Sequence, residues 1–460
     1  MSAARDPVAV VDLGKTNSKL FVVSAEGAIL SEARTRPVWR MADGFSVLDD
    51  AHLHGWILES LGEAAEAHGA RRVIVSGHGC TFALTDGDDL AHPVLDYEQE
   101  PPADIAAEID ALAPPFAETF SPALPLGFNY GRHMLWLEAA RPQAFARADA
   151  ILSYPQFWSW RLSGEKVSEV SYLGCHSHLW APLEHDYSSL VDTKGWRAKM
   201  PPLVPAGQEI GALEIGLPSG VSARIAVHNG VHDSNASLAF HRAQREGSFT
   251  LVSTGTWVIV FNPDCPLERL DERRDMLANV AVDGQPVPTI RFMGGREFDL
   301  ASGGWQGPIG LDAVASVLSS GAMALPSFAP GGPMPGHAGR FDGPPVEGEV
   351  RAAAALLYVA LMTDLSLDLI GSANPIVVDG GLARSDLFPA LLAALRPGQP
   401  VLASANAEGS ALGAARLVFD AIGVPATRDP GRRVAPAGLP GLADYRARWR
   451  ALADAMGDPR

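Results

Sequence analysis

The segment 227–236, VHNGVHDSNA, is the densest run of polar side chains in the sequence. Asp233 lies between a predicted strand, 224–227, and a predicted helix, where a carboxylate can act as a general base. The same carboxylate could serve only as the N-cap of that helix, so the spacing leaves both roles open. A metal site made by His228, His232 and Asp233 is a third interpretation, because imidazoles four residues apart share a helix face. The Asn-Gly pair between the histidines disfavours that helix.

Residues 12–19, DLGKTNSK, form the tip of a predicted β-hairpin and carry a second set of chemical groups. Backbone N–H groups, small side chains and positive charge suit phosphate, and Asp12 can hold Mg²⁺ through water. The same residues also fit an ordinary hairpin turn. A similar tip, STGT at 253–256, follows a strand in the second half of the chain. Because two tips that face each other can clamp a polyphosphate, the pair predicts nucleotide binding better than either tip alone.

Glycines follow two further predicted strands, in SGHG at 76–79 and DGG at 379–381. Without a Cβ, Gly380 and Gly381 would let the backbone approach a flat ligand such as adenine. A turn from strand to helix would explain these glycines equally well. The sequence alone therefore leaves the choice between a ligand wall and a simple turn open.

These residues need a scaffold, and the two halves of the chain repeat one plan for it: strand, polar tip, return strand, helix, strand. The predicted elements are 8–11, 20–23, 54–67 and 72–75 in the first half and 248–252, 257–261, 350–369 and 375–378 in the second. A strand after the first tip argues against a P-loop or a Rossmann fingerprint, which both need a helix there. The spacing from Gly14 to Gly255 differs from that between Gly77 and Gly380, which indicates a diverged duplication with insertions.

The predicted fold is α/β, with two similar domains at 1–240 and 241–460 and the ligand in a cleft between them. The segment 321–348 is dense in proline and glycine. It is either a surface excursion or a long ordered loop, and its composition does not decide between the two.

Composition places the chain among folded, soluble proteins: it has 460 residues, of which 47% are hydrophobic and 19% charged, and a formal charge of −17. The acidic balance without a basic cluster argues against nucleic acid or an anionic membrane as the partner. Three cysteines without C-x-x-C spacing and an N-terminus without a signal peptide favour the cytoplasm. The most apolar stretch, 352–362, is too short to cross a bilayer and runs into Asp364 and Asp368.

Four motifs in one order resemble the FGGY carbohydrate kinases, members of the actin-like superfamily of duplicated ribonuclease-H-type domains. They are DLGKTNSK at 12–19, HDSNASLAF at 232–240, STGTW at 253–257 and DGGLARSDLF at 379–388. The resemblance extends over about 12–420 and includes SGHG at 76–79 and NYGRHMLWL at 129–137. The short tip and the His-Asp pair look nearest to the rhamnulose, fuculose and xylulose kinases, so a ketose is the first expected substrate.

The resemblance implies a phosphotransferase that uses ATP and Mg²⁺ to phosphorylate a hydroxyl of a ketose or a related polyol. Asp233 matches the general base, and Asp12 matches the carboxylate near Mg²⁺. The implied nucleotide contacts are Gly14, Lys15, Thr16, Asn17, Thr254, Gly255, Thr256, Gly380, Gly381 and Ser385. The implied sugar contacts are Gly77, His78, Asn129, Arg132, His232 and Asp233.

Some positions depart from the family pattern. Lys15, His133 and Ser385 differ from the residues common there, and the sequence lacks the tetrapeptide that names the family. These departures put the phosphate contacts and the identity of the sugar in question. They leave the reaction class unaffected.

Two other functions compete with the sugar kinase. One is a nucleotide-switch ATPase of the same fold without sugar kinase activity, which sugar-stimulated ADP release would exclude. The other is a metal hydrolase built on His228, His232 and Asp233, which bound zinc would favour. The expected partner is a small-molecule sugar, with no nucleic acid and no membrane. The association state is open, with a homodimer as one option.

Overall fold

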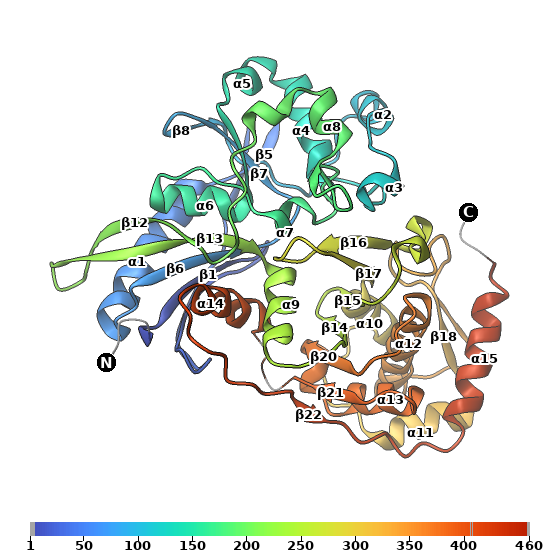
Figure 1. Ribbon diagram of the computed structural model, residues 1–460. Coiled ribbons are helices and arrows are strands. Elements are labelled where there is room, and N and C mark those ends of the chain that lie inside the picture. The colour runs from blue at the N-terminus through green and yellow to red at the C-terminus, as the bar shows by residue number, and fades with distance from the viewer. Residues whose placement is uncertain (1–4, 405, 407, 458–460) are drawn as a thin grey trace. The chain divides into compact units, whose positions relative to one another are not determined.

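The computed structural model describes residues 5–404, 406 and 408–457. They form two compact units that interleave along the chain (Figure 1). Unit 1 contains Met1–Arg245, Ala278–Pro286 and Glu408–Arg428, and unit 2 contains Glu246–Leu277, Val287–Ala407 and Asp429–Arg460. The division of the sequence into domains at 1–240 and 241–460 stays a prediction.

The centre of unit 1 is a six-stranded mixed sheet in the order β12-β13-β6-β1-β2-β3. Its strands are β1 (Val8–Leu13), β2 (Ser18–Val23), β3 (Ile29–Thr35), β6 (Arg72–Gly77), β12 (Glu209–Gly216) and β13 (Ser222–His232). β1 is parallel to β6, which is parallel to β13, whereas β2 runs back antiparallel to β1. The predicted hairpin and the predicted strand after the first helix are therefore confirmed.

Helices cover both faces of this sheet. They are α1 (Asp50–His68), α9 (Asp233–Ala243) and α14 (Gly409–Ala421). Successive side chains of a strand point to opposite faces, and β1 is apolar on both of them. Val10 packs in the cluster of α9 and α14, and Val11 packs in the cluster of α1. This is why β1 reads as a continuous hydrophobic run, as buried parallel strands do.

The strand β13 extends further than the sequence suggests. The predicted strand ends at residue 227, whereas β13 continues to His232 with a bulge after His228. Asn229 can lie inside the sheet because its side-chain amide donates to two backbone carbonyls, at 2.7 and 3.3 Å. Gly230 is needed there, since a Cβ would lie 2.7 Å from the carbonyl oxygen of Val75. The two histidines therefore lie on a strand and do not share the helix face that the metal site required.

A second sheet, most of which lies in unit 2, has seven strands in the order β16-β17-β15-β14-β20-β21-β22. Its strands are β14 (Thr250–Thr254), β15 (Val258–Phe261), β16 (Met276–Val280), β17 (Pro286–Phe292), β20 (Ile376–Gly380), β21 (Val401–Ala403) and β22 (Arg432–Arg433). β14 is antiparallel to β15 and parallel to β20, as β1 is to β2 and β6. The two units thus share the repeated plan that the sequence indicates, although β14 starts two residues later than predicted.

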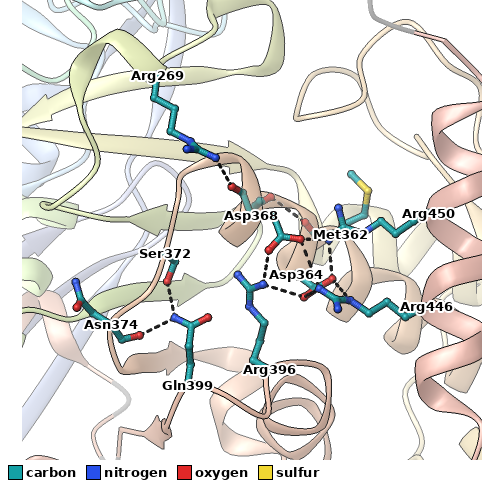
Figure 2. Close-up of polar contacts among 11 residues, drawn as sticks. Arg269, Met362, Asp364, Asp368, Ser372, Asn374, Arg396, Gln399, Arg446 and Arg450 are labelled. Carbon is teal, nitrogen blue, oxygen red and sulfur yellow. Dashed lines mark hydrogen bonds and ion pairs between the residues drawn. The ribbon is translucent and has the colours of Figure 1, made fainter.

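The longest helix of unit 2 is α12 (Gly348–Leu369), which packs against α10 (Gly294–Ser302), α11 (Leu311–Ser320) and α13 (Leu387–Leu395). Its 22 residues are long and apolar enough to cross a membrane by length and composition, but 89% of its most apolar window is buried in the protein. The predicted apolar stretch is thus part of a longer core helix. The helix continues through Asp364 and Asp368 because arginine side chains compensate both charges (Figure 2).

Smaller elements complete both units. In unit 1 they are β4 (Trp39–Ala42), β5 (Phe45–Leu48), β7 (Phe82–Asp86), β8 (Asp89–His92), α2 (Ala103–Ala111), α3 (Phe116–Thr119), α4 (Tyr130–Ala140), α5 (Pro142–Arg147), β9 (Ala150–Ser153), α6 (Tyr154–Ser163), α7 (Val170–Leu173), β10 (Trp180–Ala181), β11 (Asp186–Tyr187) and α8 (Ser189–Thr193). In unit 2 they are β18 (Met323–Leu325), β19 (Arg340–Asp342) and α15 (Leu442–Asp454). β18 and β19 pair with each other, so the segment 321–348 contains an ordered hairpin-like excursion.

Candidate active site

Three strand ends bring predicted residues of unit 1 to one edge of its sheet. Leu13 of β1 lies opposite Gly77 of β6, and Gly77 lies opposite His232 of β13. The polar residues at or next to these ends are Asp12, His78 and Asp233. Because the three strands are parallel, their carboxyl ends share the edge at which α/β domains usually bind ligands.

Asp233 is the first residue of α9 and directly follows β13. The backbone N–H and the hydroxyl of Ser234 donate to its Oδ1, the hydroxyl from 3.0 Å. Among the described residues, Oδ2 accepts no hydrogen bond, and 31% of the side chain is exposed. The carboxylate thus satisfies the start of the helix with one oxygen and keeps the other available as a proton acceptor.

His232 is buried beside Asp233, and both of its ring nitrogens have neighbours in the protein. Asn235 Nδ2 donates to His232 Nδ1 from 3.0 Å, so Nε2 carries the proton. Nε2 lies 3.3 Å from Asp233 Oδ1 and 3.2 Å from Cys175 Sγ. Burial lowers the pKa of His232 against the effect of the Asp233 charge, so the ring is neutral. These contacts orient the Asp233 carboxylate, while the predicted sugar contact of His232 stays a prediction.

His78 directly follows β6 and has one ring nitrogen without a partner. Its Nδ1 lies 2.7 Å from the Gly79 carbonyl oxygen, so Nδ1 carries the proton and Nε2 is an acceptor. Nε2 is buried and has no hydrogen-bond partner within the described part of the chain. Burial lowers the pKa of His78 to about 4, so the imidazole is neutral. It can therefore accept a hydrogen bond from a ligand hydroxyl.

Asp12 lies in an environment that disfavours its negative charge. Burial and then the nearby Asp233 carboxylate raise the pKa of Asp12 to about 7, although Lys19 and a hydrogen bond with Ser76 act in the opposite direction. Lys19 is the cross-strand neighbour of Asp12, and its Nζ donates to both carboxylate oxygens of Glu408, at 3.0 and 3.1 Å. The Lys19 ammonium group is thus shared between Asp12 and a second carboxylate.

These residues fit a divalent cation. Asp12 and Asp233 repel each other, and a hard cation bound by carboxylate oxygen removes that repulsion. No three His, Cys, Asp or Glu side chains form a metal-binding group within residues 5–404, 406 and 408–457. Asp12 would therefore hold Mg²⁺ with water and phosphate oxygens completing the shell, as is usual for this ion.

The predicted phosphate tip of unit 1 is a tight turn after β1. The Gly14 N–H donates to the Asn17 carbonyl at 3.1 Å, and a Cβ on Gly14 would lie 2.8 Å from that oxygen. Thr16 and Asn17 are exposed, as a phosphate contact requires. Lys15 differs from them, because its ammonium group is already hydrogen bonded to Asp96. Its predicted phosphate contact stays a prediction that would require this bond to break.

Two predicted sugar contacts, Asn129 and Arg132, have their polar atoms engaged within unit 1. The Asn129 side chain is fully buried, with Oδ1 accepting from the Leu124 N–H at 2.8 Å and Nδ2 donating to two carbonyls. Arg132 bonds Glu100 at 2.8 Å and Asp110 at 3.1 Å. Both side chains hold loops in place, and their direct contact with a sugar stays a prediction.

The predicted nucleotide residues of unit 2 lie at the ends of β14 and β20. Thr254 lies opposite Gly380, and its hydroxyl donates to the Asp379 carbonyl at 2.6 Å and accepts from the Leu382 N–H at 3.0 Å. Gly380 has a φ of 87°, and a Cβ there would lie 1.9 Å from the Thr254 carbonyl oxygen. Glycine is therefore required at this position by the fold itself. The exposed members of the group are Gly255, Thr256, Gly381 and Ser385.

The sequence did not connect Lys19 or Glu408 with Asp12, although both influence the charge of that carboxylate. The predicted hairpin could have indicated Lys19, because the antiparallel pairing of its two strands places Lys19 opposite Asp12. Glu408 lies 389 residues further along the chain, and no local pattern connects it with this edge. How the tips of the two units stand to each other stays a prediction.

Comparisons with known proteins identify the family. A family model described as the C-terminal domain of the carbohydrate kinase FGGY matches residues 246–427. A solved structure of a carbohydrate kinase from Novosphingobium aromaticivorans is 38% identical, with a TM-score of 0.86 over 98% of this chain and 99% of that chain. The chain belongs to the FGGY family of carbohydrate kinases. The family resemblance and the predicted fold of two duplicated ribonuclease-H-like domains are confirmed.

Two further kinases match with lower sequence identity. The L-fuculokinase of Escherichia coli (strain K12) is 26% identical over 278 residues, which are 56% of this chain and 56% of that protein. The match thus spans about half the length of this relative. A xylulose kinase from Rhodospirillum rubrum is 19% identical, with a TM-score of 0.75 over 98% of this chain and 99% of that chain, and shows the fold alone.

Proposed function

We propose that this FGGY family member is an ATP-dependent kinase that phosphorylates a hydroxyl of a small ketose or a related polyol, with Asp233 as the general base. The observation that carries the proposal is the Asp233 carboxylate, which has one oxygen bonded to Ser234 and the other unbonded among the described residues. L-fuculose is the first candidate acceptor because a relative is an L-fuculokinase. L-rhamnulose and xylulose are further candidates because the sequence motifs resemble those of rhamnulose and xylulose kinases.

In the proposed reaction, a bond forms between the sugar oxygen and the γ-phosphorus of ATP, and the bond from that phosphorus to the leaving ADP oxygen breaks. The hydroxyl proton passes to Oδ2 of Asp233. A sugar hydroxyl is a weak acid, so positioning and neutralisation of phosphate charge supply most of the rate, and the carboxylate accepts the proton late. A single carboxylate is therefore a sufficient acceptor for this proton.

The neighbouring side chains support this role of Asp233. Ser234 and the start of α9 hold Oδ1, which leaves Oδ2 as the proton acceptor. His78 Nε2 would accept a hydrogen bond from a second sugar hydroxyl and so orient the acceptor. Asp12 would hold Mg²⁺, and the ion would neutralise negative charge on the phosphates. The backbone N–H groups of Thr16 and Asn17, the two exposed residues of the turn, would approach the same phosphates.

The function is tested by an ADP-release screen across ketoses, aldoses and polyols, with mass spectrometry of the sugar. We expect at least one ketose to stimulate ADP release and to gain the mass of one phosphoryl group for each ADP formed. ADP release that is equal with and without every sugar would support the nucleotide-switch ATPase and overturn the kinase. The cytoplasmic location and the association state stay predictions.

A further inference from the structure

Lys15 directly follows the turn glycine of the first tip, yet its ammonium group is enclosed. Only 18% of the side chain is exposed. Nζ donates to Asp96 Oδ1, lies 3.7 Å from Glu98 Oε2 and stands 3.8 Å above the ring centroid of Trp39. Two carboxylates therefore surround one ammonium group, which leaves this cluster with a net negative charge. An anionic phosphate would have to displace a carboxylate to bind there.

The loop that carries Asp96 is held rigidly. Ser46 Oγ donates to Asp96 Oδ2 at 3.3 Å, and the Glu98 N–H donates to Oδ1 at 2.9 Å. Gln99 Nε2 donates to the carbonyls of Asp96 and Ser46, both at 2.8 Å, and the Gln99 carbonyl lies 2.8 Å from His133 Nε2. His133, one of the departures from the family pattern, thus supports the loop that binds Lys15, another departure. A site held this way is preorganised for a ligand.

The Lys15 cluster is continuous with His78 through one aromatic ring. Tyr97 lies 5.1 Å from Lys15 Nζ, measured to its ring centroid, and 5.2 Å from the His78 ring centroid. Trp39 Nε1 is buried and has no hydrogen-bond partner among the described residues. The arrangement therefore places a cation, a carboxylate, a neutral acceptor, an indole N–H group and two aromatic rings next to one another. These groups complement a sugar, which presents hydroxyl groups and apolar C–H faces.

We propose that Lys15 and Asp96 recognise hydroxyl groups of the acceptor that are remote from the phosphorylated one, and that their paired charges select uncharged sugars over sugar acids. The inference rests on the proposed kinase function and deepens it. Asp96 accepts from sugar hydroxyls, Lys15 donates to them, and the Trp39 ring packs against C–H groups. The excess of carboxylates around Lys15 repels a carboxylate on the substrate.

The test compares Lys15→Met and Asp96→Asn with the wild type and with Lys166→Met, which removes an ammonium group paired with Asp149 in unit 1. The readouts are KM for the sugar, KM for ATP, and calorimetric binding of the best sugar without ATP. We expect the sugar KM and Kd to rise on the order of tenfold or more in both test variants, because a charged hydrogen-bond partner is lost. KM for ATP should stay within about twofold of the wild-type value in both test variants. Lys166→Met should match the wild type in all three readouts.

A rise in KM for ATP with an unchanged sugar KM would overturn the proposal and support a phosphate contact by Lys15. Unchanged values for both substrates would overturn it as well. If Lys15→Met fails to fold, Lys15→Arg takes its place, because it keeps the positive charge. Lys15→Arg should bind the sugar more tightly than Asp96→Asn does. Equal turnover of a ketose and the matching sugar acid by the wild type would refute the charge selection. If no sugar stimulates ADP release, the proposed function fails, while calorimetry still tests sugar binding by itself.

Discussion

Two groups of carboxylates, one in each unit, differ in how the protein compensates their charge. In unit 2, the Asp364 side chain is fully enclosed and contacts the guanidinium groups of three arginines at 2.6, 2.7 and 3.5 Å (Figure 2). At the strand edge of unit 1, burial and then the like charge of Asp233 raise the pKa of Asp12 to about 7. A compensated charge suits a structural role, whereas an uncompensated one suits the binding of a cation or a proton.

Helix geometry explains the compensation in unit 2. Asp364 and Asp368 are four residues apart on α12, and Arg446 and Arg450 are four apart on α15, so each pair shares one helix face. Arg446 donates to both Asp364 oxygens, at 2.7 and 2.8 Å. Arg450 contacts Asp364 at 2.6 Å and Asp368 at 2.9 Å. The network therefore joins α15 to the buried helix α12.

The largest effect on stability is expected from Asp364→Asn. The substitution removes the fully enclosed charge that three arginines share and should cost ~3–5 kcal/mol of unfolding free energy, measured by urea denaturation. Turnover per folded molecule should not change. The control is Asp86→Asn, which removes an exposed partner of Arg147 and should cost less than ~1 kcal/mol. Equal losses for the two variants would show that the network does not stabilise unit 2.

A smaller effect on stability is expected from Glu297→Gln. This substitution tests whether a raised pKa by itself marks a functional site. Glu297 is buried, accepts from the Tyr358 hydroxyl, and has no partner for Oε1 among the described residues. Burial raises its pKa from 4.5 to about 7. The folded state therefore binds more protons than the unfolded state between these values, and stability from this group is lost as the pH rises through that window.

The measurement is the unfolding free energy of the wild type and of Glu297→Gln from pH 4.5 to pH 7.5. The wild type should lose up to ~3 kcal/mol relative to the variant across this range. Activity at fixed pH should be the same in both, because Glu297 lies in the core of unit 2. Parallel stability curves would refute the raised pKa, and a loss of turnover would give Glu297 a functional role.

The smallest effect is expected from His78→Asn and concerns the KM for the sugar. The matched control is His228→Asn. Both histidines are buried, bond a backbone carbonyl through Nδ1 and have an unpartnered Nε2 among the described residues. Only His78 lies at the strand edge, so its loss should raise the sugar KM by on the order of tenfold. His228→Asn should change stability alone. A similar rise of KM in both variants would remove the distinction between the two sites.

Much of the fold could be predicted because short buried strands and polar turns alternate in a fixed order in both halves. The helix α1 was predicted over 54–67 and extends over Asp50–His68, because Asp49 caps its start and Gly69 ends it in the left-handed conformation. The predicted end of β13 was wrong by several residues, because asparagine followed by glycine is typical of a turn. Their suitability for a strand depends on carbonyl groups and a close approach contributed by distant segments.

The candidate site could be predicted only in part. Asp12, His78 and Asp233 each follow a recognisable strand, so their positions at strand ends were readable. The partner of Lys15 was not, because Asp96 lies 81 residues away in a loop without a local pattern. Contacts between distant loops depend on the complete packing of the unit. No local pattern in a single sequence predicts such contacts.

In the proposed reaction, the Asp233 carboxylate accepts the proton of the sugar hydroxyl. The most direct test is kcat of Asp233→Asn at saturating ATP and saturating sugar, since the amide keeps the shape of the side chain and loses its basicity. We predict a fall in kcat by ~10²–10⁴-fold, with KM for ATP and the melting temperature nearly unchanged. A variant that retains more than about a tenth of the wild-type turnover would contradict the claim.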